Sequence, residues 1–305
     1  MFKRLLVLLD GSPLAETAVP IAAQLAHLVD GQLTLLHIIE RHAPTEVHHV
    51  RHLANAAEAN AYLDDVAQRS FLIDLRVETH VHANAVNDVT RSILEHAAEL
   101  QADLIVMCTH GRSGPRRFLF GSIAQQVIAH GTTPVLLIPP RLSEHPMQFN
   151  LRHIVVPLDG DPDHEQGLPV AIGLAQISHA AIHLVVVVPK IETLKDEKAA
   201  TGKLLPIATT AILDLQQSDA SEYLQAQIAR VKDSGVSIMS EVSRGDPAEV
   251  VIESARRANA DLIVLGTHGK TGMDAFWSNS ITPKVSDQSP APVLLVRIQP
   301  HPSKP

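Results

Sequence analysis

Three blocks of sequence occur twice in this chain of 305 residues, in the same order both times. The pairs are RLLVLLDGSP (4–13) with HIVVPLDGDP (153–162), ADLIVMCTHGRSG (102–114) with ADLIVLGTHGKTG (260–272), and TPVLLIPP (133–140) with APVLLVRI (291–298). Asp10 and Asp159 are 149 residues apart, whereas Gly111 and Gly269 are 158 apart, so the second copy carries nine extra residues in its middle. Ordered similarity at three places indicates a tandem duplication of one domain.

The duplication predicts two domains, in agreement with a usual size of about 100–200 residues per domain. The stretch PPRLSEHPMQFN (139–150) is rich in proline and polar residues, which is typical of a linker. We expect a first domain at 1–140, a linker at 141–152, a second domain at 153–299 and a tail at 300–305.

Short apolar runs alternate with helical periodicity in each copy. The first copy predicts strands at 5–9, 32–39, 75–82, 104–108 and 134–138, and helices at 13–29, about 46–69, 87–101 and 121–130. Ser12 is a candidate N-cap and Gly31 a C-terminal stop of the first helix. The alternation predicts an α/β fold of two tandem doubly wound domains, each with a five-stranded parallel sheet flanked by helices. Ligands of such sheets bind beyond the carboxyl ends of the strands, where Asp10 and the THG sequence (109–111) both fall.

Composition and charge exclude several classes of protein. Hydrophobic residues make up 45% and charged residues 19%, which supports packed cores and argues against disorder. A net charge of −8 without a basic block argues against a nucleic-acid partner. The single cysteine, Cys108, fits a reducing compartment. The apolar run Leu5–Leu9 is too short for a signal peptide, and we find no 18-residue apolar stretch, so we expect a cytoplasmic protein without a membrane partner.

The stretch THGRSGPRRFLFGS (109–122) combines glycines with positive charge ahead of a predicted helix. Gly111 and Gly121 leave room for a ligand against the backbone, and the helix that begins near Ser122 offers unpaired N–H groups. The arginines of the stretch are Arg112, Arg116 and Arg117. A polyphosphate fits this combination. The alternative is that the glycines only shape the crossover between strand and helix, with the arginines in water.

Asp10 ends the first predicted strand and has two possible roles. Its carboxylate can accept hydrogen bonds from a ribose or an adenine, or it can cap the helix that follows. The sequence leaves both readings open.

Together, LLVLLDGS, ADLIVMCTHGRSG, the GS that follows nine residues after Gly111, and TPVLLI resemble the universal stress protein family, once in each half. The nucleotide motif of that family is glycine, two residues, glycine, nine residues, glycine, and then serine or threonine. The resemblance implies bound ATP, with Mg²⁺, with adenine and ribose near Asp10 and Ile38 and phosphates at Gly111, Gly121 and Ser122. It also implies dimers that pair their last strands, which a tandem chain can achieve between its own halves, here 135–138 with 293–296.

The full set of nucleotide contacts that we carry over comprises two groups. In the first half these are Leu8, Asp10, Ile38, Met107, Cys108, Gly111, Arg112, Ser113, Gly121, Ser122 and Ile123, and in the second half Asp159, Val187, Gly266, Gly269, Lys270, Ser280 and Ile281.

Both halves depart from the motif. In the first half Cys108 replaces the first glycine, and in the second Asn279 replaces the last one. The stretch RSGPRRFLF carries three positive charges, whereas KTGMDAFWS carries one positive charge and Asp274, which repels phosphate, and also holds the bulky Trp277. We therefore expect the first half to hold the nucleotide more strongly than the second.

Other residues have a functional and a structural reading. Spacing would place His48 and His52 on one helix face, beside His42 and His49, but a metal site needs further ligands, and an exposed helix explains the cluster better. His110 and His268 occupy equivalent places, where a packing role is simpler than a catalytic one.

Cys108 and the insertion complete the list of candidates. A stabilised thiolate at Cys108 would sense oxidation, although an inert thiol suits the end of a buried strand. Residues 189–218 contain the extra length of the second half and predict a loop with part of a helix, either a lid, a partner surface or a tolerated insertion.

The sequence thus favours a cytoplasmic ATP-binding protein with a regulatory or stress-resistance role. Two alternatives stay open. One is slow Mg²⁺-dependent ATP hydrolysis or autophosphorylation, although no Walker lysine motif and no nucleophile–base pair is visible in the sequence. The other is a scaffold that holds no nucleotide. A homodimer of the whole chain is also possible, and the sequence does not identify a protein partner.

Overall fold

The structure is a computed structural model that describes residues 1–41, 46–47, 50–51, 53, 55–109, 121–139, 149–194, 200, 204–267 and 281–298. The first half contains β1 (Arg4–Leu8), α1 (Pro13–Glu16), α2 (Ala18–Val29), β2 (Gln32–Glu40), β3 (Glu46–Val47), β4 (Val50–Arg51), α3 (Ala56–Ala67), β5 (Val77–Val86), α4 (Val89–Glu99), β6 (Leu104–Cys108), α5 (Ser122–His130) and β7 (Val135–Ile138), with a 3₁₀ turn, η1, at Ser70–Leu72.

The second half repeats this order. It contains β8 (His153–Leu158), η3 (Pro162–His164), α6 (Gly167–Ser178), β9 (Ala181–Val188), η4 (Ile191–Thr193), α8 (Pro206–Arg230), η5 (Lys232–Ser234), β10 (Ile238–Arg244), α9 (Pro247–Arg257), β11 (Leu262–Thr267), α11 (Thr282–Gln288) and β12 (Val293–Arg297).

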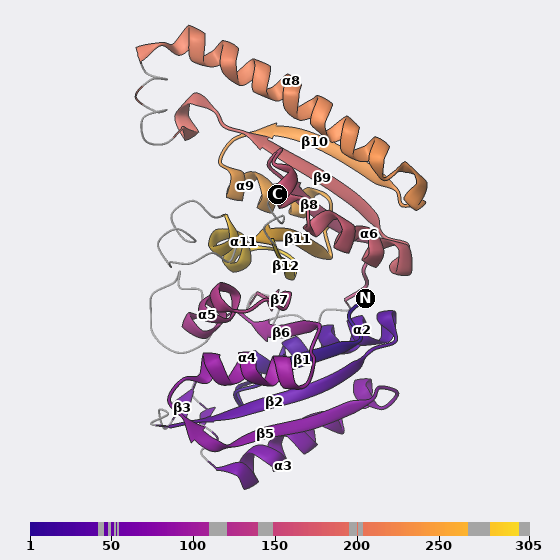
Figure 1. Cartoon of the computed structure of the whole chain (residues 1–305), viewed down its shortest axis with the longest axis vertical. Helices are drawn as coiled ribbons and strands as arrows, with labels where there is room; N and C mark the ends of the chain where they lie inside the picture. Colours follow the sequence, from indigo (N-terminus) through magenta and orange to yellow (C-terminus); the bar gives the residue numbers. More distant parts are fainter. Residues whose placement is uncertain are drawn as a thin grey trace, which may run out of the picture.

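The two halves form one continuous sheet of ten strands, in the order β10-β9-β8-β11-β12-β7-β6-β1-β2-β5. Within each half all neighbouring strands are parallel. The halves meet where β12 pairs antiparallel with β7, with Leu294 opposite Leu136. Figure 1 shows the sheet running along the molecule, with α8 at one end and α3 at the other. The predicted fold class and the predicted pairing of the last strands are both confirmed.

Helices cover both faces of the sheet, because side chains alternate between the faces along each strand. One core packs the sheet against α2, α3, α6 and α8. The other core packs it against α4, α5, α9 and α11. Both cores include side chains from β7 and β12, so each core runs unbroken from one half into the other.

Most local predictions hold, with one correction. The Ser12 side chain accepts from the Ala15 N–H at 3.1 Å and caps α1, and Asp30 ends α2 in a left-handed conformation just before Gly31. The predicted helix at about 46–69 is wrong over its first part, since two short paired strands, β3 and β4, precede α3. Asn55 caps α3 and thereby fixes where the helix begins. The predicted domain boundaries stay a prediction. None of the described helices is long and apolar enough to span a bilayer.

The aspartate of the repeated ADLIV sequence anchors the first strand of each half. Asp103 accepts hydrogen bonds from the Lys3 N–H at 2.7 Å and the Arg4 N–H at 3.0 Å. Asp261 likewise accepts from the N–H groups of Arg152 and His153, at 2.8 and 2.9 Å. The repetition of this residue therefore has a structural cause, because one carboxylate fixes where β1 or β8 starts against its neighbour.

Arg297 joins the halves through a second contact. Its Nη1 donates to the carbonyls of Ile128, Ala129 and Gly131 at 3.2, 3.3 and 2.6 Å. These carbonyls lie at the C-terminal end of α5, where a cation is favourable because the last carbonyls of a helix lack backbone partners. The side chain from β12 thus caps a helix of the other half.

We predict that Asp103→Ala lowers the free energy of unfolding by about 1–2 kcal/mol, since two backbone N–H groups lose their acceptor. The matched change in the second half, Asp261→Ala, should have a similar effect. Chemical denaturation checks both. The control is Asp74→Ala on the exposed surface, which should cost less than about 0.5 kcal/mol; equal effects of all three changes would contradict the anchoring role.

We also predict that Arg297→Ala destabilises the junction by about 1–3 kcal/mol, because three carbonyls lose a charged donor. Thermal unfolding followed by circular dichroism measures the loss. Arg256→Ala is the control, because Arg256 is exposed on α9 and pairs with Glu253 at 3.5 Å. A junction role for Arg297 requires that its substitution be the more damaging of the two.

Candidate functional site

A cavity of about 100 Å³ lies at the carboxyl ends of β1, β2 and β6 in the first half. Its described lining residues are Leu8, Leu9, Asp10, Ala15, Leu36, Ile38, Val89, Ile93, Met107, Cys108, Gly121, Ile123 and Ala124. Seven of the predicted contacts of this half are therefore brought together by the fold, although they come from four separate parts of the sequence. Gly111, Arg112 and Ser113 lie outside the described residues.

The walls of this cavity are apolar because of strand alternation. Leu8, Ile38 and Met107 belong to the core beneath α4 and α5, where Leu8 is partly and the others are largely buried. Helix α4 adds Val89 and Ile93 to the same space. A flat apolar group can therefore be held between the sheet and these helices.

Asp10 is the acidic residue of this lining, and the structure distinguishes its two readings. Its Oδ1 accepts from the Ser12 N–H at 2.9 Å, whereas Ser12 itself provides the cap of α1. The helix-cap reading of Asp10 is therefore wrong. Its other carboxylate oxygen makes no hydrogen bond with the described residues and can accept one from a ligand.

Helix α5 begins at the cavity with unpaired donors. The Gly121 N–H donates to the Thr109 carbonyl at 2.8 Å, which closes the chain between β6 and α5. The next three residues are Ser122, Ile123 and Ala124, and their N–H groups have no acceptor among the described residues. The N-cap residue, Gly121, has no side chain with which to cap the helix. This is the arrangement in which a helix end binds an anion.

In the second half the equivalent aspartate is already engaged. Asp159 repeats the turn of Asp10 by accepting from the Asp161 N–H at 3.0 Å, but its Oδ2 also contacts Nδ1 of His164. The place of His164 is taken by Ala15 in the first half, where it lines the cavity. The His164 imidazole thus contacts Oδ2 of Asp159, whereas the corresponding oxygen of Asp10 has no hydrogen-bond partner among the described residues.

The rest of the second-half motif is also changed. A Cβ at Gly266 would lie 2.7 Å from the His164 carbonyl oxygen, so this glycine is required by the η3 turn. Helix α11 begins at Thr282, beyond Ile281, and the next residue is Pro283, which has no N–H to offer an anion. Gly269, Lys270 and Ser280 lie outside the described residues.

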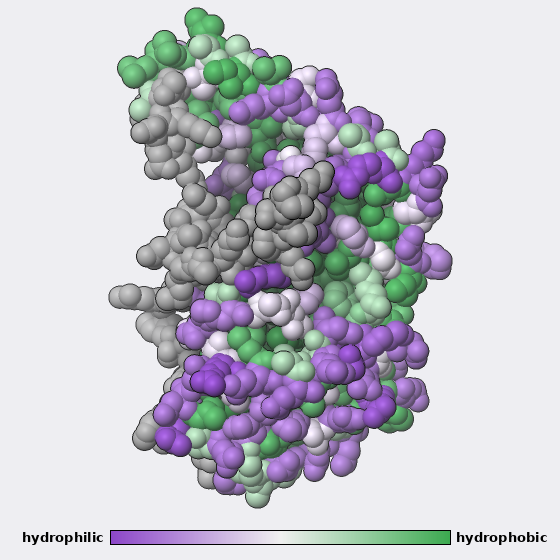
Figure 2. Space-filling view, viewed as in Figure 1, coloured by the Kyte–Doolittle hydropathy of each residue, from purple (hydrophilic) through white to green (hydrophobic). Residues whose placement is uncertain are grey.

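A larger cavity of about 780 Å³ lies in the second half, beneath α8. Asp159 and Val187 line it, together with Leu213 of α8. Gly11 and Gly160 share a φ of 86°, but a Cβ at Gly11 would meet Leu53 at 2.9 Å, whereas nothing lies within 4 Å at Gly160. The second half is therefore open where a leucine packs in the first. Figure 2 shows apolar residues at the adjoining end of α8, and the exposed ones there are Leu204, Leu205, Ile207, Ile212 and Leu215.

Sequence reasoning missed a repeated contact between the first helical turn and the long helix of each half. Glu165 accepts from the Tyr223 hydroxyl at 2.8 Å, from Gln227 at 2.6 Å and from Arg230 at 2.7 Å. Burial and then Glu165 raise the pKa of Tyr223, which keeps the phenol protonated.

The same contact recurs in the first half. Arg69 pairs with Glu16 at 2.8 Å, and the buried Tyr62 hydroxyl lies near that carboxylate without making a hydrogen bond. Burial and then the Glu16 charge raise the pKa of Tyr62 as well. The signal was a Tyr-Leu pair with arginine seven residues after the tyrosine, present at 62–69 and 223–230.

Of the remaining candidate residues, the structure describes Cys108 but not the histidines of the two loops or of 42–52. Cys108 is buried at the end of β6, as an inert thiol would be. His110, His268 and the histidines of 42–52 lie outside the described residues. Among the residues that the structure describes, no group of three histidine, cysteine or acidic side chains is arranged to hold a metal ion.

Comparisons with known proteins agree on one family. A sequence model of the universal stress protein family matches residues 1–139 and again residues 150–297. A universal stress protein of Mycolicibacterium smegmatis is 25% identical over 308 residues, which cover 96% of this chain and 96% of that protein. A universal stress protein of Methanocaldococcus jannaschii is 30% identical over 146 residues, which cover 48% of this chain and 82% of that protein.

Solved structures repeat the architecture of the whole chain. The crystal structure of a universal stress protein from Archaeoglobus fulgidus superimposes with a TM-score of 0.69 at 16% identity and covers 97% of each chain. At this level of identity the likeness establishes the fold.

We predict that Gly266→Ala lowers the free energy of unfolding by about 1–3 kcal/mol, since the new methyl group meets a backbone oxygen that cannot move freely. Differential scanning calorimetry measures the loss. The matched control is Cys108→Ala at the equivalent position, which should cost less because the site already accommodates a side chain. A larger cost at Cys108 would contradict the steric argument.

Proposed function

Since the chain belongs to the universal stress protein family, we propose that it binds ATP and acts as a regulatory or stress-resistance protein, with the nucleotide held mainly in the first domain. One observation carries the proposal. Apolar strand ends, an open carboxylate oxygen and an uncapped helix meet at a single cavity. These are the groups that an adenine, a ribose and a phosphate need, respectively.

The first-half residues would have distinct roles. Leu8, Ile38 and Met107 would hold the adenine between the sheet and α4. Asp10 would accept from a ribose hydroxyl, as a charge-assisted hydrogen bond. The N–H groups from Ser122 onward would bind phosphate, and Mg²⁺ would offset the phosphate charge.

Cys108 does not oppose this assignment. Its side chain lies in the wall of the cavity, where a small thiol leaves space, and it replaces a glycine at the equivalent of Gly266. In the second half the His164 carbonyl is sufficient by itself to require a glycine at this position. A cysteine in the first half is thus compatible with a nucleotide.

The second half supports binding less well. The His164 imidazole contacts Asp159, and Pro283 removes one donor from the start of α11. We therefore expect one strong site per chain. The larger cavity beneath α8 opens beside Asp159 and would suit a different ligand or a partner.

The role that we propose for ATP is regulatory. A nucleotide between α4, α5 and the sheet can change the activity of the protein only if it binds one conformation more tightly than another. Turnover is not needed for this role, and a cytoplasmic location fits it. These statements, like a homodimer of the whole chain, remain proposals.

We predict that the purified protein releases an adenine nucleotide on denaturation and that Gly121→Asp weakens ATP binding at least about tenfold, because a carboxylate at the start of α5 repels phosphate. Mass spectrometry of the released ligand and calorimetric titration with MgATP measure these effects. The matched control is Asn279→Asp, the equivalent change in the second half, which should leave the affinity of the strong site unchanged.

Two results would overturn the proposal. Binding that Asn279→Asp abolishes and Gly121→Asp spares would move the nucleotide to the second half. No nucleotide and no binding by the unmodified chain would favour a scaffold that holds none. Release of phosphate from ATP at a measurable rate would instead support the slow hydrolase.

A further inference from the structure

Three imidazoles meet between the edge strand and the next helix of the first half. His80 and His82 lie two residues apart on β5, so their side chains point to the same face of the sheet. His96 of α4 lies above them, with its ring centroid 4.8 Å from that of His80 and 5.0 Å from that of His82. We call β5, α4 and these three rings the histidine joint.

The ring of His96 is buried, and a backbone carbonyl fixes its tautomer. His96 is 6% exposed, and its Nδ1 lies 2.8 Å from the Ser92 carbonyl oxygen. A carbonyl can only accept, so Nδ1 carries the proton of the neutral ring. The other two imidazoles adjoin this ring, so a proton taken up on β5 would place a positive charge beside a site from which water is largely excluded.

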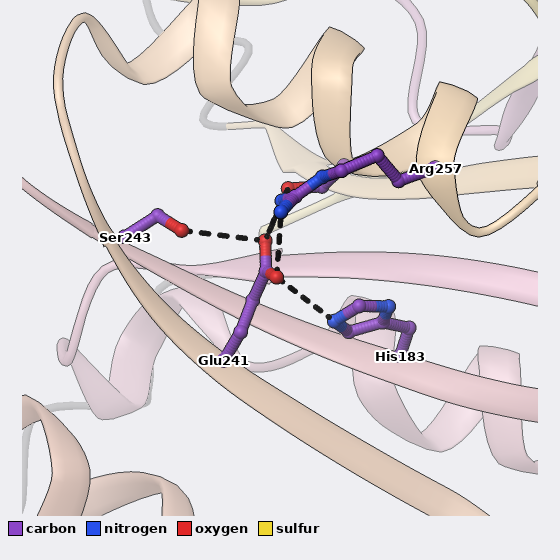
Figure 3. Close-up of polar contacts among 5 residues, drawn as sticks. His183, Glu241, Ser243 and Arg257 are labelled. Carbon is purple, nitrogen blue, oxygen red and sulfur yellow. Dashed lines mark hydrogen bonds and ion pairs between the residues drawn. The ribbon is translucent and has the colours of Figure 1, made fainter.

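At the equivalent position in the second half, between β10 and α9, the contact is made by paired charges. Sheet register and helix position place Glu241, Ser243, Ser254 and Arg257 where the first half has His80, His82, His96 and Glu99. Arg257 Nη2 donates to Oε1 and Oε2 of Glu241 at 2.8 and 3.0 Å. Figure 3 shows this carboxylate between Arg257, Ser243 and His183, whose Nε2 lies 3.6 Å from Oε2. Burial lowers the pKa of His183, but Glu241 raises it, because a proton taken up by this ring meets a negative charge directly.

The histidine joint has much less opposing charge. Burial, and then His96 and His82, lower the pKa of His80, while Glu99 raises it. On this face β2 contributes Leu36 and Ile38 opposite the two histidines. Two other acidic groups of the joint form ion pairs, Glu78 with Arg76 at 2.8 Å and Glu95 with Arg91 at 2.8 Å. The remaining two are Asp88, which caps α4, and Glu40, which lies opposite Val86.

An imidazole can take up a proton near neutral pH, so proton uptake is a chemistry that this cluster offers. We propose that the histidine joint is an acid-responsive contact, in which protonation of a second imidazole loosens β5 from α4 while the second half stays closed. Helix α4 also supplies Val89 and Ile93 to the first-half cavity, so loosening would open one wall of that cavity. This last consequence rests on the proposed function, whereas the loosening itself does not.

The direction of the pH dependence follows from the neutral state of the closed joint. A histidine whose pKa is lowered in the closed form binds its proton more readily in the open form, where its pKa is near the ordinary 6.5. The closed joint is therefore fully stable above that value and loses stability as the pH falls through it.

The test is hydrogen–deuterium exchange of the full chain at about pH 7.5 and about pH 5.5, corrected for the chemical exchange rate at each pH. Peptides that cover 77–86 and 89–99 report the histidine joint. Peptides that cover 238–244 and 247–257 are the matched control within the same molecule. We expect protection at the joint to fall at least about threefold in acid, with little change in the control peptides.

Two variants link the response to the imidazoles. His82→Gln removes one of the two partly exposed rings of β5 and should reduce the acid response while leaving the fold intact. A combined variant introduces the residues of the second half at the equivalent positions of the first and should abolish the response. It carries His80→Glu, His82→Ser, His96→Ser and Glu99→Arg. Equal loss of protection in both halves, or an undiminished response in His82→Gln, would overturn the proposal, whether or not the protein binds ATP.

Discussion

The antiparallel contact between β7 and β12 is the constraint on which the architecture depends. Each of these strands would be a free edge if its half stood alone, with unpaired N–H and C=O groups. Pairing them satisfies both edges and joins ten strands into one sheet. Alternate side chains of the two strands enter opposite cores, so both cores cross the junction. Arg297 adds a polar tie from β12 to the end of α5.

Duplication has preserved this frame while the two sites diverged. Asp103 and Asp261 each anchor the first strand of their half by accepting backbone hydrogen bonds. The carboxylates of Glu16 and Glu165 each pair with an arginine, Arg69 and Arg230 respectively. At the carboxyl ends of the strands the halves differ. Asp10 keeps one oxygen open, whereas His164 contacts the corresponding oxygen of Asp159. Residues that hold the fold are thus repeated more faithfully than those at the carboxyl ends of the strands.

The divergence extends to the outer strands. In the first half the contact of β5 with α4 is made by three imidazoles, and in the second half the contact of β10 with α9 is made by an arginine and a carboxylate. Both arrangements fit the same backbone, because the two helices have equal length and equivalent positions beside the sheet. They differ in how they respond to a proton, since a carboxylate can offset a charge that a neutral ring cannot.

The sequence by itself determined the duplication and the parallel order of each half, and its resemblance to the universal stress protein family implied the pairing of the last strands and seven of the residues that line the first-half cavity. It could do so because buried strands, caps and glycine spacings leave local signals, as at Leu5–Leu9 and Ser12. It misplaced the start of α3, where the local pattern suited a helix as well as the short strands that form. Only the tertiary structure decided that His164 contacts Asp159, that Gly266 faces a carbonyl oxygen, and that three histidines from two elements share one place. The contacts of Gly266 with His164 and of His96 with His80 join different elements of the sheet and its helices, so they exist only once the fold has brought those elements together.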